Sequence, residues 1–271
     1  MSIIYTPKGK AREYAPLAAN LYSGCTHGCL YCYAPAIQRK TLDQFKENAE
    51  PRRNILQQLE YDCKKHYASK KHVHLNFTHD PYDSIDKDNK ITRLALKSFL
   101  RNKIPVAILT KGGDNVLRDI DLFCKFENHI RVGCTLTFDN ESDSLKWEPK
   151  AALPNERIFL LEKLKSLGVP TWASFEPVID PEQSLKLIEK TIDIVDFYKI
   201  GKLNNHKGID SEIDWFDFAI KAIEILRKNN KQFYIKEDLR KYIPDIHLEE
   251  NEKNPDAMQV KNFNHIDDIF K

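Results

Sequence analysis

The sequence predicts an α/β fold built on a parallel sheet, and three observations predict it. Short apolar runs bounded by turn residues recur along the chain. Amphipathic stretches with a helical period separate most of these runs, and no Gly/Ser-rich or Pro-rich linker interrupts the series. Strands that alternate with helices in this way are typical of a parallel sheet covered by helices, and the unbroken series favours one domain.

Six of the apolar runs have the length and composition of strands. We expect strands at Leu17–Tyr22, Val73–Thr78, Val106–Thr110, Arg131–Thr137, Thr171–Phe175 and Phe197–Ile200. Helical periodicity fills most of the intervals and follows the last strand. We expect helices at Arg53–Tyr67, Thr92–Lys103, Val116–Phe126, Glu156–Leu167, Glu182–Thr191 and Trp215–Asn229. Gly168 with Pro170 supports one helix end, and Asn229 with Asn230 supports another.

The remainder of the chain is less regular. Gln232–Ile235 is a candidate seventh strand, and a short helix up to Tyr242 follows it. From residue 244 the sequence is polar and aperiodic. We therefore predict a core domain over residues 1–243 and a polar C-terminal tail over residues 244–271 that packs on the core or extends from it. The sequence carries no signal for the oligomeric state.

Composition narrows the class of protein. The 271 residues carry a formal net charge of +2, with 41% hydrophobic and 30% charged residues, which excludes a disordered chain or a polycation. No apolar stretch approaches the roughly 18 residues that span a bilayer, and the first residues lack the apolar segment of a signal peptide. We expect a soluble, cytoplasmic protein without membrane association, in which the six cysteines are thiols or metal ligands.

Polar side chains gather at or just after the ends of the predicted strands. In a parallel barrel these ends share one face, where ligands bind. A strand end is often polar for no functional reason, yet several together suggest one polar mouth. The residues concerned are Thr78, His79, Asp80, Thr110, Lys111, Thr135, Thr137, Glu176 and Lys199.

Three of the six cysteines follow the first predicted strand at the spacing C-x3-C-x2-C. Cys25, Cys29 and Cys32 stand on a loop short enough for all three sulfurs to bind one inorganic centre. A [4Fe–4S] cluster held by three cysteines keeps one iron free for substrate or cofactor. The alternative is a structural zinc ion with His27 or a distant histidine as fourth ligand, although the second C-x2-C pair of a zinc ribbon is missing.

The loop resembles the signature of the radical S-adenosylmethionine (radical SAM) superfamily. The resemblance implies a partial (β/α)6 barrel related to the TIM barrel, with Cys25, Cys29 and Cys32 binding the [4Fe–4S] cluster. It also implies that S-adenosylmethionine chelates the open iron and is cleaved reductively to a 5′-deoxyadenosyl radical, which abstracts hydrogen from a substrate. An external electron donor of the flavodoxin or ferredoxin type is implied as partner.

Within the superfamily the sequence is most similar to spore photoproduct lyase and its relatives. Tyr31 and Tyr33 flank the last cysteine as in that branch, which makes both candidate catalytic residues. The resemblance implies cofactor-binding roles for strand-end residues, and Glu176 joins them as a further candidate. The candidate cofactor-binding residues are Thr78, Asp80, Lys111, Thr135 and Glu176. Two further pairs, Glu148-Pro149 and Glu156-Arg157, resemble pairs of the same branch.

One departure concerns the substrate. Spore photoproduct lyase is thought to return hydrogen from a cysteine just before the polar motif of the second strand, where this chain has Phe77. Thymine-dimer repair by that route is therefore not expected. Cys134 on a neighbouring strand is a candidate hydrogen donor, and its alternative is a small buried thiol packed in a strand.

A nucleic acid is a candidate substrate class. The run Lys64–His74 contains four lysines and three histidines, and Arg52 and Arg53 lie nearby in the sequence. Such a run guides phosphates or simply forms a solvated helix end. The alternative to an enzyme is a nucleic-acid-binding or interaction protein with a zinc knuckle and no turnover; a third class keeps the cluster for electron transfer or sensing.

Overall fold

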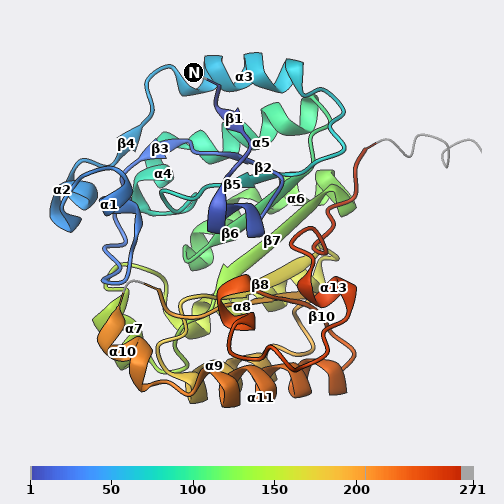
Figure 1. Ribbon diagram of the computed structural model, residues 1–271. Helices are drawn as coiled ribbons and strands as arrows, with labels where there is room; N and C mark the ends of the chain where they lie inside the picture. The colour runs from blue at the N-terminus through green and yellow to red at the C-terminus, as the bar shows by residue number, and fades with distance from the viewer. Residues whose placement is uncertain (1, 205, 264–271) are drawn as a thin grey trace, which may run out of the picture.

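The computed structural model describes residues 2–204 and 206–263. One curved eight-stranded sheet organises the chain, in the order β1-β2-β5-β6-β7-β8-β9-β10 (Figure 1). Every neighbouring pair from β2 to β10 is parallel, and only β1 is antiparallel. The strands are β1 (Ile4–Tyr5), β2 (Leu17–Ala19), β5 (Val73–Leu75), β6 (Val106–Thr110), β7 (Ile130–Thr135), β8 (Thr171–Phe175), β9 (Phe197–Ile200) and β10 (Gln232–Ile235).

Helices connect the parallel strands and pack on the outer side of the sheet. Figure 1 shows α3 and α5 at one end of the sheet and α9 and α11 at the other. The longer helices are α3 (Ile55–Lys65), α5 (Ile91–Arg101), α6 (Ile120–Phe126), α7 (Glu141–Trp147), α8 (Pro154–Ser166), α9 (Pro181–Lys190) and α11 (Trp215–Lys228). The shorter ones are α1 (Ala34–Ile37), α2 (Leu42–Glu47), α4 (Ser84–Asn89), α10 (Lys207–Glu212), α12 (Glu237–Arg240) and α13 (Glu250–Lys253).

The α/β fold with a parallel sheet is confirmed, including β10 as the seventh parallel strand. The expected strand over Leu17–Tyr22 is instead divided into β2 and β3 (Tyr22–Ser23), which pairs with β4 (Glu50–Pro51) outside the main sheet. The strand β5 ends at Leu75, three residues earlier than expected. Asn20 explains this early end, because its side chain accepts hydrogen bonds from the backbone N–H groups of residues 77 and 78.

Several helices, and the end of one strand, differ from what the hydrophobic periodicity of the sequence predicts. The expected helix over Val116–Phe126 begins as a 3₁₀ helix (Gly113–Asp119) and becomes α-helical only from Ile120. The strand β7 ends at Thr135 rather than at Thr137. Six α-helices of the described residues were missed (α1, α2, α4, α7, α10 and α13), each with no more than seven residues, which is too short to show a helical period.

Alternation along the strands separates two faces of the sheet. Ile108 and Cys134 belong to the large apolar core between sheet and helices. Leu109 and Thr135, the next residues, line a cavity on the inner side. This period of two is what a strand imposes, and it fixes which strand residues can meet a ligand.

Segments from the N-terminal and the C-terminal parts of the chain both pack on the inner side of the sheet. A second apolar cluster packs Met258 and Val260 of the expected tail against Trp172 and Phe197. Lys199 Nζ, fully buried, donates hydrogen bonds to the backbone oxygens of residues 13 and 14, at 2.5 and 3.0 Å. The described part of the tail therefore packs on the sheet. Residues 264–271 of the tail lie outside the described residues, and the domain division at residue 243 stays a prediction.

Two buried imidazoles should make stability depend on pH. Burial lowers the pKa of both His72 and His74 to about 3, against 6.5 for an exposed histidine. The unfolded chain then binds protons that the folded chain does not bind, so the free energy of unfolding decreases as pH falls below about 6.5. We expect a loss of about 2 kcal/mol per imidazole near pH 5. Urea titrations of wild type and His72→Asn check this: the variant should show a weaker pH dependence, and an identical dependence would contradict the account.

Among the described residues, no helix is long and apolar enough to cross a bilayer.

Candidate active site

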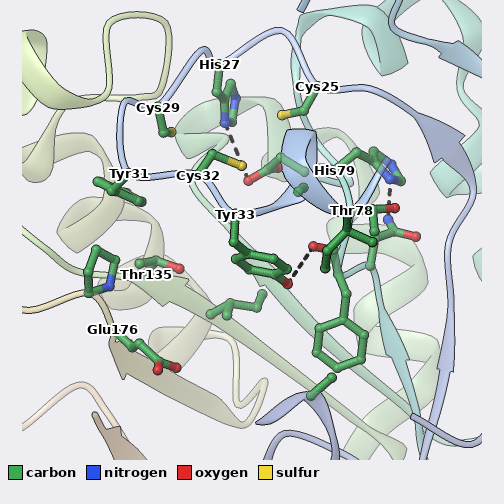
Figure 2. A pocket seen from close by; sticks show the side chains of 18 of the residues that line it. Cys25, His27, Cys29, Tyr31, Cys32, Tyr33, Thr78, His79, Thr135 and Glu176 are labelled. Atoms are coloured by element: carbon green, nitrogen blue, oxygen red, sulfur yellow. Dashed lines mark hydrogen bonds and ion pairs between the residues drawn. The ribbon is translucent and has the colours of Figure 1, made fainter. Parts of the chain in front are cut away.

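A cavity of about 760 Å³ opens at the carboxyl ends of the strands, and Figure 2 shows the residues around it. It brings together nearly all the residues that sequence analysis selected. The predicted residues lining it are Cys25, Cys29, Cys32, Tyr31, Tyr33, Thr78, Asp80, Lys111, Thr135 and Glu176. Its volume lies within the usual range for small-molecule sites. The polar mouth expected at the strand ends is therefore present, but Thr137 and Lys199, which were expected there, do not line it.

The cysteine loop runs from β3 to α1, and its backbone is fixed at several points. Gly24 has φ of +83°, and a Cβ there would lie 2.4 Å from the carbonyl oxygen of Phe45, so only glycine fits. The N–H of Leu30 donates to the oxygen of Trp147 at 2.8 Å, and the N–H of Lys150 donates to the oxygen of His27 at 3.2 Å. The loop is thus held between α2 and the segment that follows α7.

The three thiols of the loop are unpaired; Cys29 is buried, whereas Cys25 and Cys32 are partly exposed. All six cysteines of the chain are unpaired. Burial raises the pKa of Cys29 to about 12, and it also raises the pKa values of Cys25 and Cys32. Thiols in such surroundings stay protonated until a metal replaces the proton. Nowhere in residues 2–204 and 206–263 do three His, Cys, Asp or Glu side chains gather closely enough to hold a single metal ion.

A buried network of charged side chains contacts the cysteine loop through Tyr31. Tyr31 donates a hydrogen bond from its hydroxyl to Glu148, which also pairs with the guanidinium of Arg157. Arg157 is 1% exposed and donates further bonds to the backbone oxygens of Ala152 and Thr135, at 2.9 and 3.0 Å. Burial disfavours the charge on Glu148, but Arg157 and Lys111 hold its pKa below the usual range. This network connects the cysteine loop to β7 and α8.

Loss of the carboxylate in this network should destabilise the fold. Glu148→Gln leaves the buried guanidinium of Arg157 without its counter-charge, so we expect a loss of about 3 kcal/mol in the free energy of unfolding. The reconstituted variant should also lose iron faster than wild type, because Tyr31 then donates to a neutral amide oxygen in place of a carboxylate, which is a weaker bond. Urea denaturation and iron release to a chelator measure the two effects. The double variant Glu148→Gln/Arg157→Met should recover part of the stability; unchanged stability of the single variant would contradict this role.

Asp80 organises the loop after β5. Its carboxylate accepts hydrogen bonds from the Thr110 hydroxyl at 2.6 Å, the Lys111 N–H at 2.6 Å and the Tyr82 N–H at 2.9 Å. His27 Nδ1 lies 3.7 Å from it. Burial opposes ionisation of Asp80, yet His27 and Lys111 keep its pKa below the usual range. Both carboxylate oxygens are already engaged by the protein, which indicates a positioning residue.

Thr78 carries a hydroxyl and Lys111 an ammonium group that can bind a ligand, whereas the carboxylate of Asp80 is bonded to the protein. The Oγ1 atom of Thr78 is buried and has no hydrogen-bond partner among the described residues. Lys111 Nζ lies 5.9 Å from the centre of the Tyr31 ring. Burial lowers the pKa of Lys111, but the nearby Cys29, Glu148 and Asp80 outweigh burial and raise it, so the side chain is charged. A free hydroxyl and a free ammonium beside three thiols fit the amino and carboxylate groups of an amino-acid cofactor.

The remaining predicted residues lie around the same cavity. Tyr33 is partly exposed, and its hydroxyl donates to the backbone oxygen of Phe77 at 2.9 Å (Figure 2). Thr135 lines the cavity from the end of β7. Glu176 follows β8 and accepts hydrogen bonds from Tyr14 Oη at 2.6 Å and from Lys236 Nζ. With both oxygens partnered, Glu176 is part of a charged wall.

Two sequence-based expectations are not supported by this geometry. Cys134 is absent from the cavity lining; it is fully buried on the helix side of β7, with Sγ 3.7 Å from the Arg157 backbone oxygen. The alternation that brings Thr135 inward sends Cys134 outward, so the geometry fits the alternative of a small buried thiol packed in a strand. The lysines of the run Lys64–His74 precede β5 and therefore lie at the amino end of that strand, opposite the mouth.

Sequence reasoning missed several residues of the cavity. Tyr14 comes from the segment between β1 and β2, Asn204 follows β9, and Lys236 follows β10. They meet at Glu176: the amide of Asn204 donates to it at 3.1 Å. The position of Lys236 immediately after a strand was an available signal. No local pattern marked Tyr14.

The sequence pattern of the radical SAM superfamily matches residues 19–195, which include the cysteine loop and the strands β5 to β8. The chain belongs to the radical SAM superfamily. Its members share cleavage of S-adenosylmethionine at an iron–sulfur cluster. The chain is also 32% identical over 193 residues to MJ0683, an uncharacterized protein of Methanocaldococcus jannaschii, covering 70% of this chain and 71% of that protein.

Solved structures of radical SAM enzymes share the fold. SuiB of Streptococcus suis bound to S-adenosylmethionine matches with a TM-score of 0.62 and 15% identity over 90% of this chain. This chain covers 55% of SuiB. A spore photoproduct lyase mutant with bound cofactor and dinucleoside photoproduct matches with a TM-score of 0.63 and 13% identity, over 82% of this chain and 76% of the lyase. The predicted architecture of the radical SAM type is therefore confirmed.

Proposed function

We propose that this protein is an enzyme that binds a [4Fe–4S] cluster at Cys25, Cys29 and Cys32 and cleaves S-adenosylmethionine at the open iron. When bound, the cluster supplies one electron that breaks a carbon–sulfur bond of the cofactor, leaving methionine and a 5′-deoxyadenosyl radical that takes a hydrogen atom from the substrate. The observation that carries the proposal is the meeting of the three cysteine thiols in one cavity with the charged Lys111 side chain and with the Thr78 hydroxyl, which has no hydrogen-bond partner among the described residues.

The residues of this chain would hold the cofactor by complementary charge. Lys111 would pair with the methionyl carboxylate, and the Thr78 hydroxyl would accept a bond from the methionyl ammonium. Asp80 would keep Lys111 in place through its bonds to Thr110 and the Lys111 backbone. Glu148 and Arg157 would fix the loop that carries the thiols.

The partner of the first step would be a small protein of the flavodoxin or ferredoxin type that reduces the cluster. Leu30, between two of the cysteines, is 49% exposed, so the loop comes close to the surface. A nucleic acid or nucleotide is the proposed substrate class. Four lysines that line the cavity support recognition of a phosphate: Lys8, Lys10, Lys202 and Lys236. The lysines of the run at residues 64–74 do not, because they lie at the opposite end of β5.

The enzymatic proposal is tested without a substrate. Anaerobically reconstituted protein with dithionite and S-adenosylmethionine should release 5′-deoxyadenosine, because uncoupled cleavage needs only the cluster and the cofactor. Reduced flavodoxin or ferredoxin should replace dithionite. Absence of 5′-deoxyadenosine from a preparation that holds a full iron complement would overturn the proposal. A colourless preparation with one zinc per chain would favour the metal-knuckle alternative.

A further inference from the structure

Away from the thiols, the cavity has an aromatic floor formed by Tyr14, His74 and Phe77. The rings of His74 and Phe77 are 4.6 Å apart between centres, and that of Tyr14 lies 5.9 Å from His74 and 6.0 Å from Phe77. All three side chains line the cavity. The planes of His74 and Phe77 differ by 31°, whereas Tyr14 meets Phe77 edge-on at 75°. His74 and Phe77 therefore offer a polarizable surface for a flat ring, and Tyr14 borders it.

His74 adds an unused polar atom to this floor. The side chain is 1% exposed, and its Nδ1 has no hydrogen-bond partner among the described residues. Burial, with smaller contributions from Lys199 and His72, lowers the pKa of His74 to about 3, so the ring is neutral at physiological pH. A neutral imidazole offers one donor and one acceptor. A flat ligand that itself carries ring nitrogens or carbonyl groups would satisfy the Nδ1 atom, whereas a hydrocarbon ring would not.

A lysine wall, defined as Lys8, Lys10, Lys202 and Lys236, lines the same cavity. Its members come from three separate segments: the chain before β2, the loop after β9 and the residue after β10. Lys202 and Lys236 are buried, whereas Lys8 and Lys10 are exposed. Four lysines from distant segments that line one cavity are unlike a solvated helix face, where cations follow one another along the chain.

Carboxylates hold three of these lysines in place. Lys10 Nζ lies 2.5 Å from Asp238, Lys202 pairs with Asp210, and Lys236 pairs with Glu176. Asp210 and Asp238 are not part of the cavity lining, so they stand behind the lysines. Lys10 Nζ also donates to Asn204 Oδ1 at 2.7 Å, and Lys236 Nζ also lies 3.5 Å from Glu13. An ammonium group has three donors, so Lys10 keeps one for a ligand. Because the carboxylates offset most of the charge, the wall suits one discrete phosphate better than the continuous backbone of a nucleic acid.

We infer that the substrate is a nucleoside phosphate of small size, with its base on the aromatic floor against His74 and its phosphate on the lysine wall. This inference rests on the proposed function and narrows its substrate class from nucleic acids to free nucleotides. His74 sets the preference for a heteroaromatic ring, and Lys10 binds the phosphate. The two parts lie in one cavity with the thiols, so a substrate placed there lies within the same enclosed space as the cofactor.

Binding of defined probes to the cluster-loaded enzyme with saturating S-adenosylmethionine tests the inference. The probes for anaerobic equilibrium dialysis are the 5′-monophosphates of adenosine, guanosine, cytidine, uridine and thymidine, the matching nucleosides, and ribose 5-phosphate. At least one monophosphate should bind about tenfold more tightly than its nucleoside and than ribose 5-phosphate, since each half then contributes separately. His74→Leu should remove the preference over ribose 5-phosphate, and Lys10→Met the preference over the nucleoside.

The controls separate this inference from the proposed function. Lys10 is exposed, so its variant should fold even where the His74 variant does not, and Lys228→Met removes an exposed lysine far from the cavity. Three outcomes would overturn the inference: no monophosphate binds, a monophosphate competes with S-adenosylmethionine, or only a single-stranded oligonucleotide binds. If iron content and 5′-deoxyadenosine release are normal in the same preparation, the failure concerns the substrate class alone.

Discussion

Replacing Cys29 with alanine should abolish both cluster binding and cleavage of S-adenosylmethionine while the sheet remains folded. Three thiols are the minimum that holds a [4Fe–4S] cluster with one open iron, so two thiols should fail to retain it. The loop lies at one edge of a large apolar core, and Cys29 makes no side-chain bond that the core requires. Iron and sulfide content should fall to background, and 5′-deoxyadenosine release should become undetectable, with an unchanged far-ultraviolet circular dichroism spectrum.

Two matched cysteine variants control this result. Cys124→Ala removes an exposed thiol on α6, and Cys134→Ala removes the buried thiol on the helix side of β7. Both should keep the iron content and the uncoupled cleavage rate of wild type, with a modest loss of stability for the buried site. If Cys29→Ala retained a full cluster, or if Cys134→Ala lost it, the assignment of the ligands would be wrong.

Lys111→Met should weaken binding of S-adenosylmethionine by about 10- to 100-fold while the cluster is retained. The charged Lys111 side chain lines the cavity beside Tyr31, and a charge-assisted bond to a carboxylate stabilises a complex by about 1.5–3 kcal/mol. Methionine has a similar length but no charge. Titration of the reduced cluster with S-adenosylmethionine, followed by electron paramagnetic resonance, gives the dissociation constant.

The charge-matched control is Lys228→Met on the exposed end of α11, which should bind the cofactor as wild type does. Thr78→Val should give a smaller loss than Lys111→Met, since it removes one hydroxyl bond. Equal affinities of wild type and Lys111→Met would show that the ammonium group does not contact the cofactor.

The sequence predicts the sheet well because apolar strands bounded by turns leave a strong local pattern. That pattern predicts the six principal strands and the polar residues at their ends. The spacing of the cysteines predicts the cysteine loop. Cys134 could have been placed correctly by the same reasoning. If Thr135 faces the cavity, the residue before it must face the helices.

Other features depend on contacts between distant parts of the chain. Tyr14, Glu176 and Lys236 meet from residues far apart in sequence, and only the fold brings them together. The early end of β5 depends on the side chain of Asn20, which bonds to the backbone of residues 77 and 78. The short helices α1, α2 and α7 surround the cysteine loop but are too brief to show a period.

The central claim is that the cysteine loop holds a cluster whose open iron binds S-adenosylmethionine. Iron, sulfide and zinc analysis of anaerobically reconstituted protein, with electron paramagnetic resonance of the reduced state with and without the cofactor, tests it most directly. The account predicts about four irons per chain and a spectrum that changes when S-adenosylmethionine is added. One zinc and no iron per chain would contradict it, and so would a full cluster whose spectrum does not change when S-adenosylmethionine is added.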